Sequence, residues 1–305
     1  MDITSHSIAA AAERLRPHIR RTPCLSVEVP TPHSIQPVVL KLESMQVTGS
    51  FKVRGATNSL LRSGAPEVVA CSGGNHGLAV AWAAQRLGCR ATVVVPQSAS
   101  PTKVAAMQRT GAEVIQHGDV PAEAFLVAEQ LVAERGWPLV HPYNQEATIE
   151  GQATLGLELL ADHPTVSHWM IAVGGGGLAA GVALALGDRA QIVPVEPVGC
   201  PSLAEAQRIG EVVATRAEGI ARTSLGPPAL GELPWEVLQN VAQCNLVTDE
   251  AIVAAQRWLW TEVRLVAEPG GATALAALMC GAWSPPENAS LGIVVCGGNA
   301  DALPA

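Results

Sequence analysis

Short, uninterrupted apolar segments alternate with helical segments along most of this chain. Residues 68–71, 91–95 and 169–173 are three such apolar segments, and each precedes a stretch of helical character that ends at a glycine. Apolar segments without polar alternation are typical of strands buried on both faces, and strands separated by helices form parallel sheets. The sequence therefore predicts an α/β fold built from mostly parallel sheets flanked by helices.

Local signals predict some of the remaining structure. Residues 1–22 are rich in alanine and end in a basic turn, which favours a helix that proline at position 23 cannot continue. The β-branched segment 38–43 predicts a strand, and residues 139–141 predict another. We expect residues 215–235, which contain a Gly-Pro-Pro sequence, to be irregular.

Composition limits the classes of function that are open to the chain. Its 305 residues are 48% hydrophobic and 15% charged, as expected of a globular protein large enough for two lobes. A net charge of −8 argues against nucleic acid as a partner, because no excess of lysine and arginine is present to neutralise phosphates. No apolar stretch reaches the roughly 20 residues that span a bilayer, and residues 1–21 lack a secretory pattern. The seven cysteines are scattered without a C-x-x-C pair or a His/Cys cluster, so we predict a cytoplasmic protein without disulfides or a metal site.

Lys52 is the first residue with an evident chemical role. It lies between the apolar side chains of Phe51 and Val53, with Gly49 and Gly55 on either side. Apolar surroundings disfavour the charged ammonium, and the neutral amine is a nucleophile suited to a Schiff base with an aldehyde. A lysine near a helix start is more often a solvated surface residue, so Lys52 alone does not identify the chemistry.

Four consecutive glycines at 174–177 follow one of the apolar segments and precede a predicted helix. Glycines allow successive backbone N–H groups to turn toward an anion, and the helix N-terminus adds partial positive charge. This arrangement predicts a phosphate-binding loop that needs no lysine. Two alternatives stay open: a tight turn without a ligand, and a dinucleotide site. Glu196 lies at about the right distance for the dinucleotide site, but Ala179 replaces its third glycine.

Two further motifs, Ser72-Gly73-Gly74-Asn75-His76-Gly77 and Cys296-Gly297-Gly298-Asn299, also follow or interrupt apolar segments. Together with the lysine segment and the glycine loop, they resemble the motif set of the pyridoxal-phosphate-dependent serine/threonine dehydratases (ammonia-lyases). These enzymes have the tryptophan synthase β-like fold, fold type II, and are related to serine racemase. The resemblance covers nearly the whole chain in the same order. It implies a small domain of residues 50–142 inserted in a large cofactor-binding domain of residues 1–49 and 143–305.

The resemblance also implies roles for individual residues. Lys52 is expected to be the catalytic residue and to hold the cofactor, pyridoxal 5'-phosphate. The expected cofactor-binding residues are Phe51, Lys52, Asn75, Gly174, Gly175, Gly176, Gly177, Leu178, Glu268 and Cys296. The expected substrate-binding residues are Ser50, Ser72, Gly73, Gly74, Asn75 and His76. The crossing between the lobes, at residues 142–145, is expected to contribute further contacts.

Gly73 and Cys296 make this resemblance more specific. In serine racemases a second serine at the position of Gly73 is the base on the face opposite the lysine, and glycine cannot replace it. Because racemisation needs acid-base groups on both faces, this departure favours elimination. In the resembling family a Ser or Cys at the position of Cys296 faces the pyridine nitrogen of the cofactor. A weak, neutral partner there limits the ring as an electron sink, which favours elimination over transamination.

These features predict an L-threonine or L-serine dehydratase, which removes water from a β-hydroxy amino acid to give a 2-oxo acid and ammonia. One alternative is a dehydratase of another β-hydroxy amino acid, such as hydroxyaspartate or an aryl-serine, and another is a serine racemase-like enzyme. A non-catalytic sensor that binds pyridoxal phosphate or a nucleotide is a third, although the retention of Lys52 beside all three loops argues against it. The resemblance implies a homodimer acting on a small-molecule amino acid.

Overall fold

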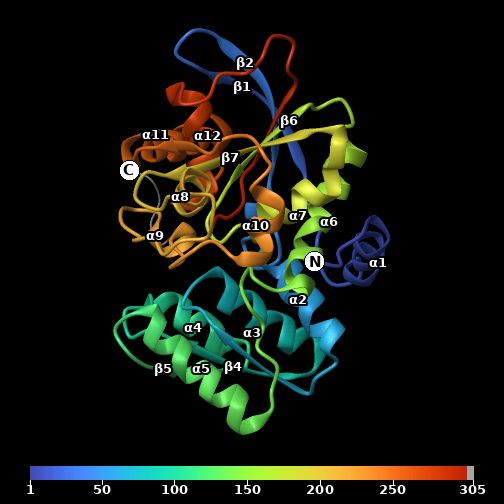
Figure 1. Cartoon of the computed structure of the whole chain (residues 1–305), viewed down its shortest axis with the longest axis vertical. Helices are drawn as coiled ribbons and strands as arrows, with labels where there is room; N and C mark the ends of the chain where they lie inside the picture. The colour runs from blue at the N-terminus through green and yellow to red at the C-terminus, as the bar shows by residue number, and fades with distance from the viewer. Residues whose placement is uncertain (301–305) are drawn as a thin grey trace.

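The computed structural model describes residues 1–300 and contains two sheets, one in each of two lobes (Figure 1). The larger sheet has six strands in the order β1 (Cys24–Pro30), β2 (Ile35–Lys41), β9 (Leu291–Val294), β6 (His168–Ala172), β7 (Gln191–Pro197) and β8 (Asn245–Val247). Every pair from β2 to β8 is parallel, and β1 is antiparallel to β2. The predicted α/β class with mostly parallel sheets is therefore confirmed.

Helices cover both faces of the larger sheet. Figure 1 shows α6 (Glu146–Asp162) and α7 (Gly177–Leu186) on one side, and α11 (Asp249–Trp258) and α12 (Pro269–Cys280) on the other. The core of this lobe includes the fully buried Trp169, whose ring occupies the space above Gly292. A Cβ atom on Gly292 would lie 2.3 Å from that ring, so only glycine allows this close packing. The other helical elements of the lobe are α1 (Ser5–Leu15), α8 (Ser202–Ile209), α9 (Arg222–Leu225), α10 (Glu232–Leu238), the π-helix Leu259–Val263 and the short 3₁₀ helices Glu43–Met45 and Gly187–Arg189.

The smaller sheet has three parallel strands, β3 (Glu67–Cys71), β4 (Arg90–Val95) and β5 (Glu113–Gln116). It is accompanied by α2 (Lys52–Ser63), α3 (Asn75–Leu87), α4 (Pro101–Arg109) and α5 (Pro121–Arg135). All of these elements lie within residues 50–142, the range predicted for the small domain. The positions of the two domain boundaries stay a prediction.

Four segments differ from the sequence-based expectation. The first helix is capped by Thr4 and ends at Leu15, well before Pro23, because Pro17 cannot continue it. Residues 139–141 form no strand, and only an isolated bridge joins Val69 to Leu139. The segment expected to be irregular contains α9 and the start of α10, and β1 was not predicted. Only Val29 of β1 is fully buried, so this edge strand lacks the apolar run that marks the other strands.

A buried ionic network ties α2 to the larger lobe. Arg54, fully buried, donates hydrogen bonds to both carboxylate oxygens of Glu43 at 2.8 Å and to Glu158 at 2.8 and 3.0 Å. Lys41, also fully buried, donates to Glu158 as well, at 2.6 Å. Burial would raise the pKa of Glu43, but the adjacent Arg54 guanidinium outweighs burial and holds that pKa below its usual range. Because a buried charge without its partner is costly, this network fixes the position of the helix that begins with Lys52.

Candidate active site

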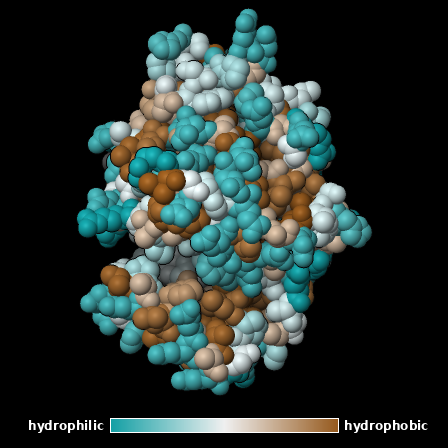
Figure 2. Space-filling model, in the orientation of Figure 1, coloured by the Kyte–Doolittle hydropathy of each residue, from teal (hydrophilic) through white to brown (hydrophobic). Residues whose placement is uncertain are grey.

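A cavity of about 170 Å³ lies between the two lobes, where the chain leaves β3, β6 and β9. Figure 2 shows this face of the molecule hollowed at the junction. The carboxyl ends of parallel strands are the usual place for ligands in open α/β sheets. The side chains that bring charge or polarity to the lining are Lys52, Cys71, Ser72, Asn75, His76, Tyr143, Arg222, Thr223, Ser224, Glu268 and Cys296.

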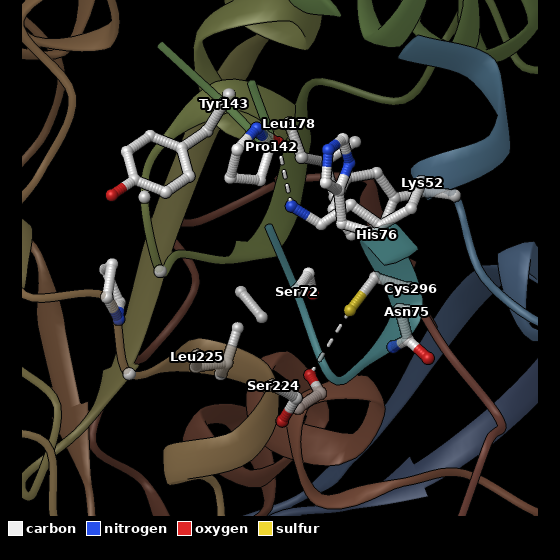
Figure 3. A pocket seen from close by; sticks show the side chains of 18 of the residues that line it. Lys52, Ser72, Asn75, His76, Pro142, Tyr143, Leu178, Ser224, Leu225 and Cys296 are labelled. Carbon is white, nitrogen blue, oxygen red and sulfur yellow. Dashed lines mark hydrogen bonds between the residues drawn. The ribbon is translucent and has the colours of Figure 1, made fainter. Parts of the chain in front are cut away.

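Lys52 opens α2 and its amine points into the cavity (Figure 3). Its Nζ donates a hydrogen bond to the carbonyl oxygen of Pro142 at 3.0 Å and lies 5.1 Å from the centre of the Phe51 ring. Burial lowers the pKa of Lys52 to about 8, against a smaller opposing effect of Cys296 and Glu268. A substantial fraction of the amine is therefore neutral near physiological pH, as nucleophilic attack and proton abstraction both require.

The four glycines form a loop that presents backbone alone to the cavity. Within the described part of the chain, the N–H groups of Gly174, Gly175 and Gly176 have no hydrogen-bond partner. The loop has no room for side chains, because a Cβ on Gly175 would lie 2.2 Å from the Tyr143 ring and one on Gly174 would lie 3.0 Å from Cα of Leu225. Helix α7 begins at the end of this loop, so unpaired N–H groups and the positive helix terminus face the same cavity.

The loop after β3 presents side chains instead. The Ser72 hydroxyl accepts a hydrogen bond from the N–H of Gly74 at 3.2 Å, and Asn75 begins α3. The Asn75 amide donates to Glu268, and its oxygen accepts from Asn299 Nδ2 at 2.8 Å. Asn299 fixes this orientation because its same nitrogen donates to the carbonyl of Thr48, which can only accept.

His76 is a structural part of the same loop. Its Nε2 lies 2.8 Å from the carbonyl oxygen of Val140, so this nitrogen carries the proton. Burial lowers the pKa of His76 to about 3, with a further contribution from Lys52, so the ring is neutral at physiological pH. We assign His76 no proton transfer.

Cys296 lies two residues after β9, the last strand, and lines the same cavity as the glycine loop. Its thiol is buried and donates to the carbonyl oxygen of Gly270 at 3.3 Å, which Figure 3 shows as a dashed line. Burial raises the pKa of this thiol well above its usual range, so Cys296 offers a neutral group. Glu268 raises the thiol pKa further.

Most of the predicted site residues line this one cavity. The exceptions are Ser50, Gly73 and Gly74. Ser50 is fully buried and its backbone pairs with Gly297, so its predicted contact with substrate stays a prediction. A Cβ on Gly73 would point at Ala99, 2.7 Å from its Cβ. The lining also includes Arg222, Thr223, Ser224 and Leu225 from α9, which are not among the predicted site residues.

The dinucleotide interpretation of the glycine loop is not supported by the position of Glu196. This carboxylate is fully buried and accepts hydrogen bonds from the N–H groups of Leu203 and Ala204 at 2.8 and 2.9 Å. It therefore does not face the cavity, where a ribose would need it. The described residues contain no group of three or more His, Cys, Asp or Glu side chains placed to hold a metal ion. None of their helices is long and apolar enough to cross a membrane.

The cavity fits pyridoxal phosphate by three independent observations. A partly neutral lysine faces a cup of unpaired N–H groups, which match an aldehyde and a phosphate on one ligand. The neutral thiol of Cys296 can face a ring nitrogen without protonating it. The residues that would hold the cofactor are thus Lys52, the four glycines and Cys296.

Comparison with known proteins agrees with this fit. The family model described as "Pyridoxal-phosphate dependent enzyme" matches residues 15–297. The chain is 35% identical to a serine racemase of Oryza sativa subsp. indica, over 97% of this chain and 91% of that protein. It is also 35% identical to a phenylserine dehydratase of Ralstonia pickettii, over 97% and 93% of the two chains. A solved threonine deaminase structure, from the organism abbreviated T.th., superposes with a TM-score of 0.88 at 34% identity, covering 98% of this chain and 99% of the other. The chain belongs to the fold type II family of pyridoxal-phosphate dependent enzymes, and its cofactor is pyridoxal 5'-phosphate.

Proposed function

We propose that this protein is an ammonia-lyase that removes water from L-threonine or L-serine, giving a 2-oxo acid and ammonia. The observation that carries this proposal is the one-sided supply of bases. Lys52 is a partly neutral base on one side of the cavity, whereas the position of the second racemase base is Gly73. A side chain at that position would point into space that Ala99 already occupies. Elimination needs one base at the α-carbon, and racemisation needs one on each face.

The chain's own residues account for cofactor binding, substrate binding and removal of the α-proton. Bound pyridoxal phosphate supplies the electron-withdrawing ring that acidifies the α-proton of an attached amino acid. Lys52 Nζ then accepts this α-proton, for which a pKa near 8 is suitable. The N–H groups of the glycine loop hold the phosphate, and Ser72 and Asn75 bind the substrate carboxylate. Tyr143 and Leu225 close the sides of the loop and limit the access of water.

Substrate choice within this class is tested by an amino-acid panel. Purified holoenzyme is incubated with L-threonine, L-serine, 3-hydroxyaspartate and 3-phenylserine, and the release of 2-oxo acid and ammonia is measured. We expect the highest kcat/KM for threonine or serine. A preference for phenylserine would instead favour the activity named for the Ralstonia pickettii relative. Formation of D-serine faster than 2-oxo acid would contradict the proposal and favour a racemase.

Attachment of the cofactor is tested separately. The visible absorbance of the protein is recorded before and after borohydride reduction, and the reduced protein is mapped by peptide mass spectrometry. We expect the visible band to disappear and the pyridoxyl group to be on Lys52. Tight cofactor binding without turnover of any amino acid would favour a sensor.

The family resemblance supports a homodimer, and the scattered cysteines together with the lack of a secretory pattern support a cytoplasmic location. We include both in the proposal. Light scattering of the purified protein measures the mass in solution. We expect about twice the 31.5 kDa of one chain. Fractionation of the source cells tests the location.

A further inference from the structure

Ser202, the first residue of α8, contacts the glycine loop from behind. Its Oγ lies 2.6 Å from the carbonyl oxygen of Gly174 and 2.8 Å from Oε1 of Glu196. The exposed fractions of Ser202 and Glu196 are 1% and 0%, so solvent does not compete for these contacts. Neither residue lines the cavity, and neither is among the residues predicted to bind pyridoxal phosphate or substrate.

The number of protons available decides how these three oxygens interact. A carbonyl oxygen can only accept, so the short contact with Gly174 uses the single proton of the Ser202 hydroxyl. The second short contact, with Glu196, is then a full hydrogen bond only when Glu196 is protonated and donates to Ser202. The short distances thus favour a chain of donors that runs from Glu196 through Ser202 to Gly174.

The electrostatics of Glu196 agree with this proton count. Burial raises the pKa of Glu196 to about 7, and the N–H groups of Leu203 and Ala204 oppose the shift. The thiol of Cys244 also faces this carboxyl, with Sγ 3.5 Å from Oε2. The protonated form is therefore available near physiological pH.

The Gly174 carbonyl controls the direction of a group that faces the cavity. In a trans peptide the C=O of one residue and the N–H of the next lie in one plane and point in opposite directions. Because Ser202 holds the Gly174 carbonyl, the N–H of Gly175 points away from α8. This N–H has no partner within residues 1–300, and Gly175 lines the cavity. A peptide between two glycines has no side chain of its own to limit its rotation, and the Ser202 contact restrains its carbonyl.

We propose that Ser202 is a positioning residue for the cofactor phosphate, with Glu196 as the buried acid that completes its hydrogen bonding. Ser202 keeps the Gly174–Gly175 peptide from rotating and so directs the Gly175 N–H toward the phosphate. This inference rests on the assignment of the glycine loop to the phosphate under the proposed function. It does not depend on which amino acid the enzyme uses.

Binding of two related aldehydes to the apoenzyme tests the proposal. The dissociation constants of pyridoxal phosphate and of pyridoxal, which lacks the phosphate, are measured by absorbance titration for wild type, Ser202→Ala and Ser202→Thr. We expect Ser202→Ala to raise the dissociation constant of pyridoxal phosphate about tenfold, the equivalent of one hydrogen bond. The dissociation constant of pyridoxal should not change. Ser202→Thr keeps the hydroxyl and should restore most of the affinity.

A matched control separates positioning from general destabilisation. Ser59 is also buried and bonded through its hydroxyl, to Thr148 at 3.0 Å, but does not contact the loop. Ser59→Ala should lower the melting temperature of the apoenzyme and leave both dissociation constants near wild type. The proposal would be overturned if Ser202→Ala lost affinity equally for pyridoxal and pyridoxal phosphate, or lost affinity for neither. If wild type binds pyridoxal phosphate but turns over no amino acid, the proposed function fails while the role of Ser202 is still decided by these titrations.

Discussion

The loop after β6 and the loop after β3 have the same backbone plan but offer different chemistry to the cavity. Each leaves the carboxyl end of a parallel strand and runs directly into a helix, α7 in one case and α3 in the other. The first contains glycines 174–177 and presents N–H groups enclosed by neighbouring side chains. The second presents the side chains of Ser72 and Asn75. Recognition in the first loop therefore depends on shape, whereas recognition in the second depends on functional groups, and substitutions should separate the two.

Lys52 lies between the two loops and should affect turnover more than either. We expect Lys52→Ala to lower kcat by at least about 10³-fold, because it removes both the attachment point and the base. Lys52→Arg should be equally inactive, since arginine stays charged. Both variants should still bind pyridoxal phosphate non-covalently through the glycine loop, which equilibrium dialysis measures. Near-normal turnover in either variant would show that Lys52 is not the base.

The depressed pKa of Lys52 predicts a distinct pH dependence of the apoenzyme. With a pKa of about 8 instead of 10.5, the neutral fraction at pH 7 is about 300-fold larger than for a solvated lysine. Labelling of Lys52 by pyridoxal and cyanoborohydride should therefore rise with pH and reach half its maximum near pH 8. Mass spectrometry of the Lys52 peptide across this pH range measures the midpoint. A midpoint near 10.5, the ordinary value for a solvated lysine, would show that burial does not act on Lys52 in solution.

Gly175→Ala tests the dependence of the first loop on shape. The new methyl group would overlap the Tyr143 ring, so we expect the loop to shift and the affinity for pyridoxal phosphate to fall by about 100-fold, within the range of overpacking costs. Gly187→Ala is the control, since a Cβ there meets nothing within 4 Å. Its φ of 53° with ψ of −135° is a conformation that side chains rarely adopt, so stability should fall by about 1–3 kcal/mol without a change in cofactor affinity. Equal cofactor affinity in the two variants would be evidence against a closely fitted loop.

Ser72→Ala tests the dependence of the second loop on functional groups. Loss of one hydroxyl should raise KM for the amino acid about tenfold while the dissociation constant of pyridoxal phosphate stays unchanged. Steady-state kinetics at saturating cofactor and a separate cofactor titration give the two values. The opposite result, a higher dissociation constant for the cofactor with an unchanged KM, would exchange the roles assigned to the two loops.

Gly73→Ser should have the smallest effect, because racemase activity requires space for the new side chain. The serine Cβ would lie 2.7 Å from Cβ of Ala99, so we expect the single variant to show no racemisation. Gly73→Ser combined with Ala99→Gly removes the obstructing methyl and should produce slow, measurable D-serine from L-serine. Chiral chromatography with Ala99→Gly as the control measures this. If wild type racemised L-serine as fast as it eliminated water, the glycine at position 73 would not distinguish a dehydratase from a racemase.

The residues that could be predicted from the sequence are those with a local chemical signature. The four glycines and Cys296 each follow an apolar strand closely, and Lys52 opens a helix between two apolar neighbours. In each case chain position and residue type together indicate a ligand. Their convergence on one cavity follows from the parallel sheets, in which the carboxyl ends of the strands meet at one edge. The α/β class was predictable for the same reason, because buried parallel strands are continuously apolar.

Other parts of the site depend on contacts between distant segments. Ser224 and Leu225 reach the cavity from the four-residue α9, which has no periodicity to reveal it. Residues 139–141 are apolar enough for a strand, but the backbone turns at His141, whose Nδ1 accepts from the N–H of Asn144 at 2.8 Å. The role of Ser202 depends on a tertiary contact 28 residues away in sequence, which no local pattern predicts.

The ionic contacts of Arg54 also determine which part of the molecule can move. Separating Arg54 from Glu43 or Glu158 would leave a buried charge without its partner, at a cost of about 3–5 kcal/mol. Arg54 is two residues after Lys52 on the same helix, so Lys52 is fixed to the larger lobe although it opens the segment that leads to the smaller one. Any closing of the three-stranded sheet over a substrate must therefore pivot about α2. In such a movement the loop of Ser72 would approach a stationary amine, and the proposed attachment point of the cofactor would keep one geometry.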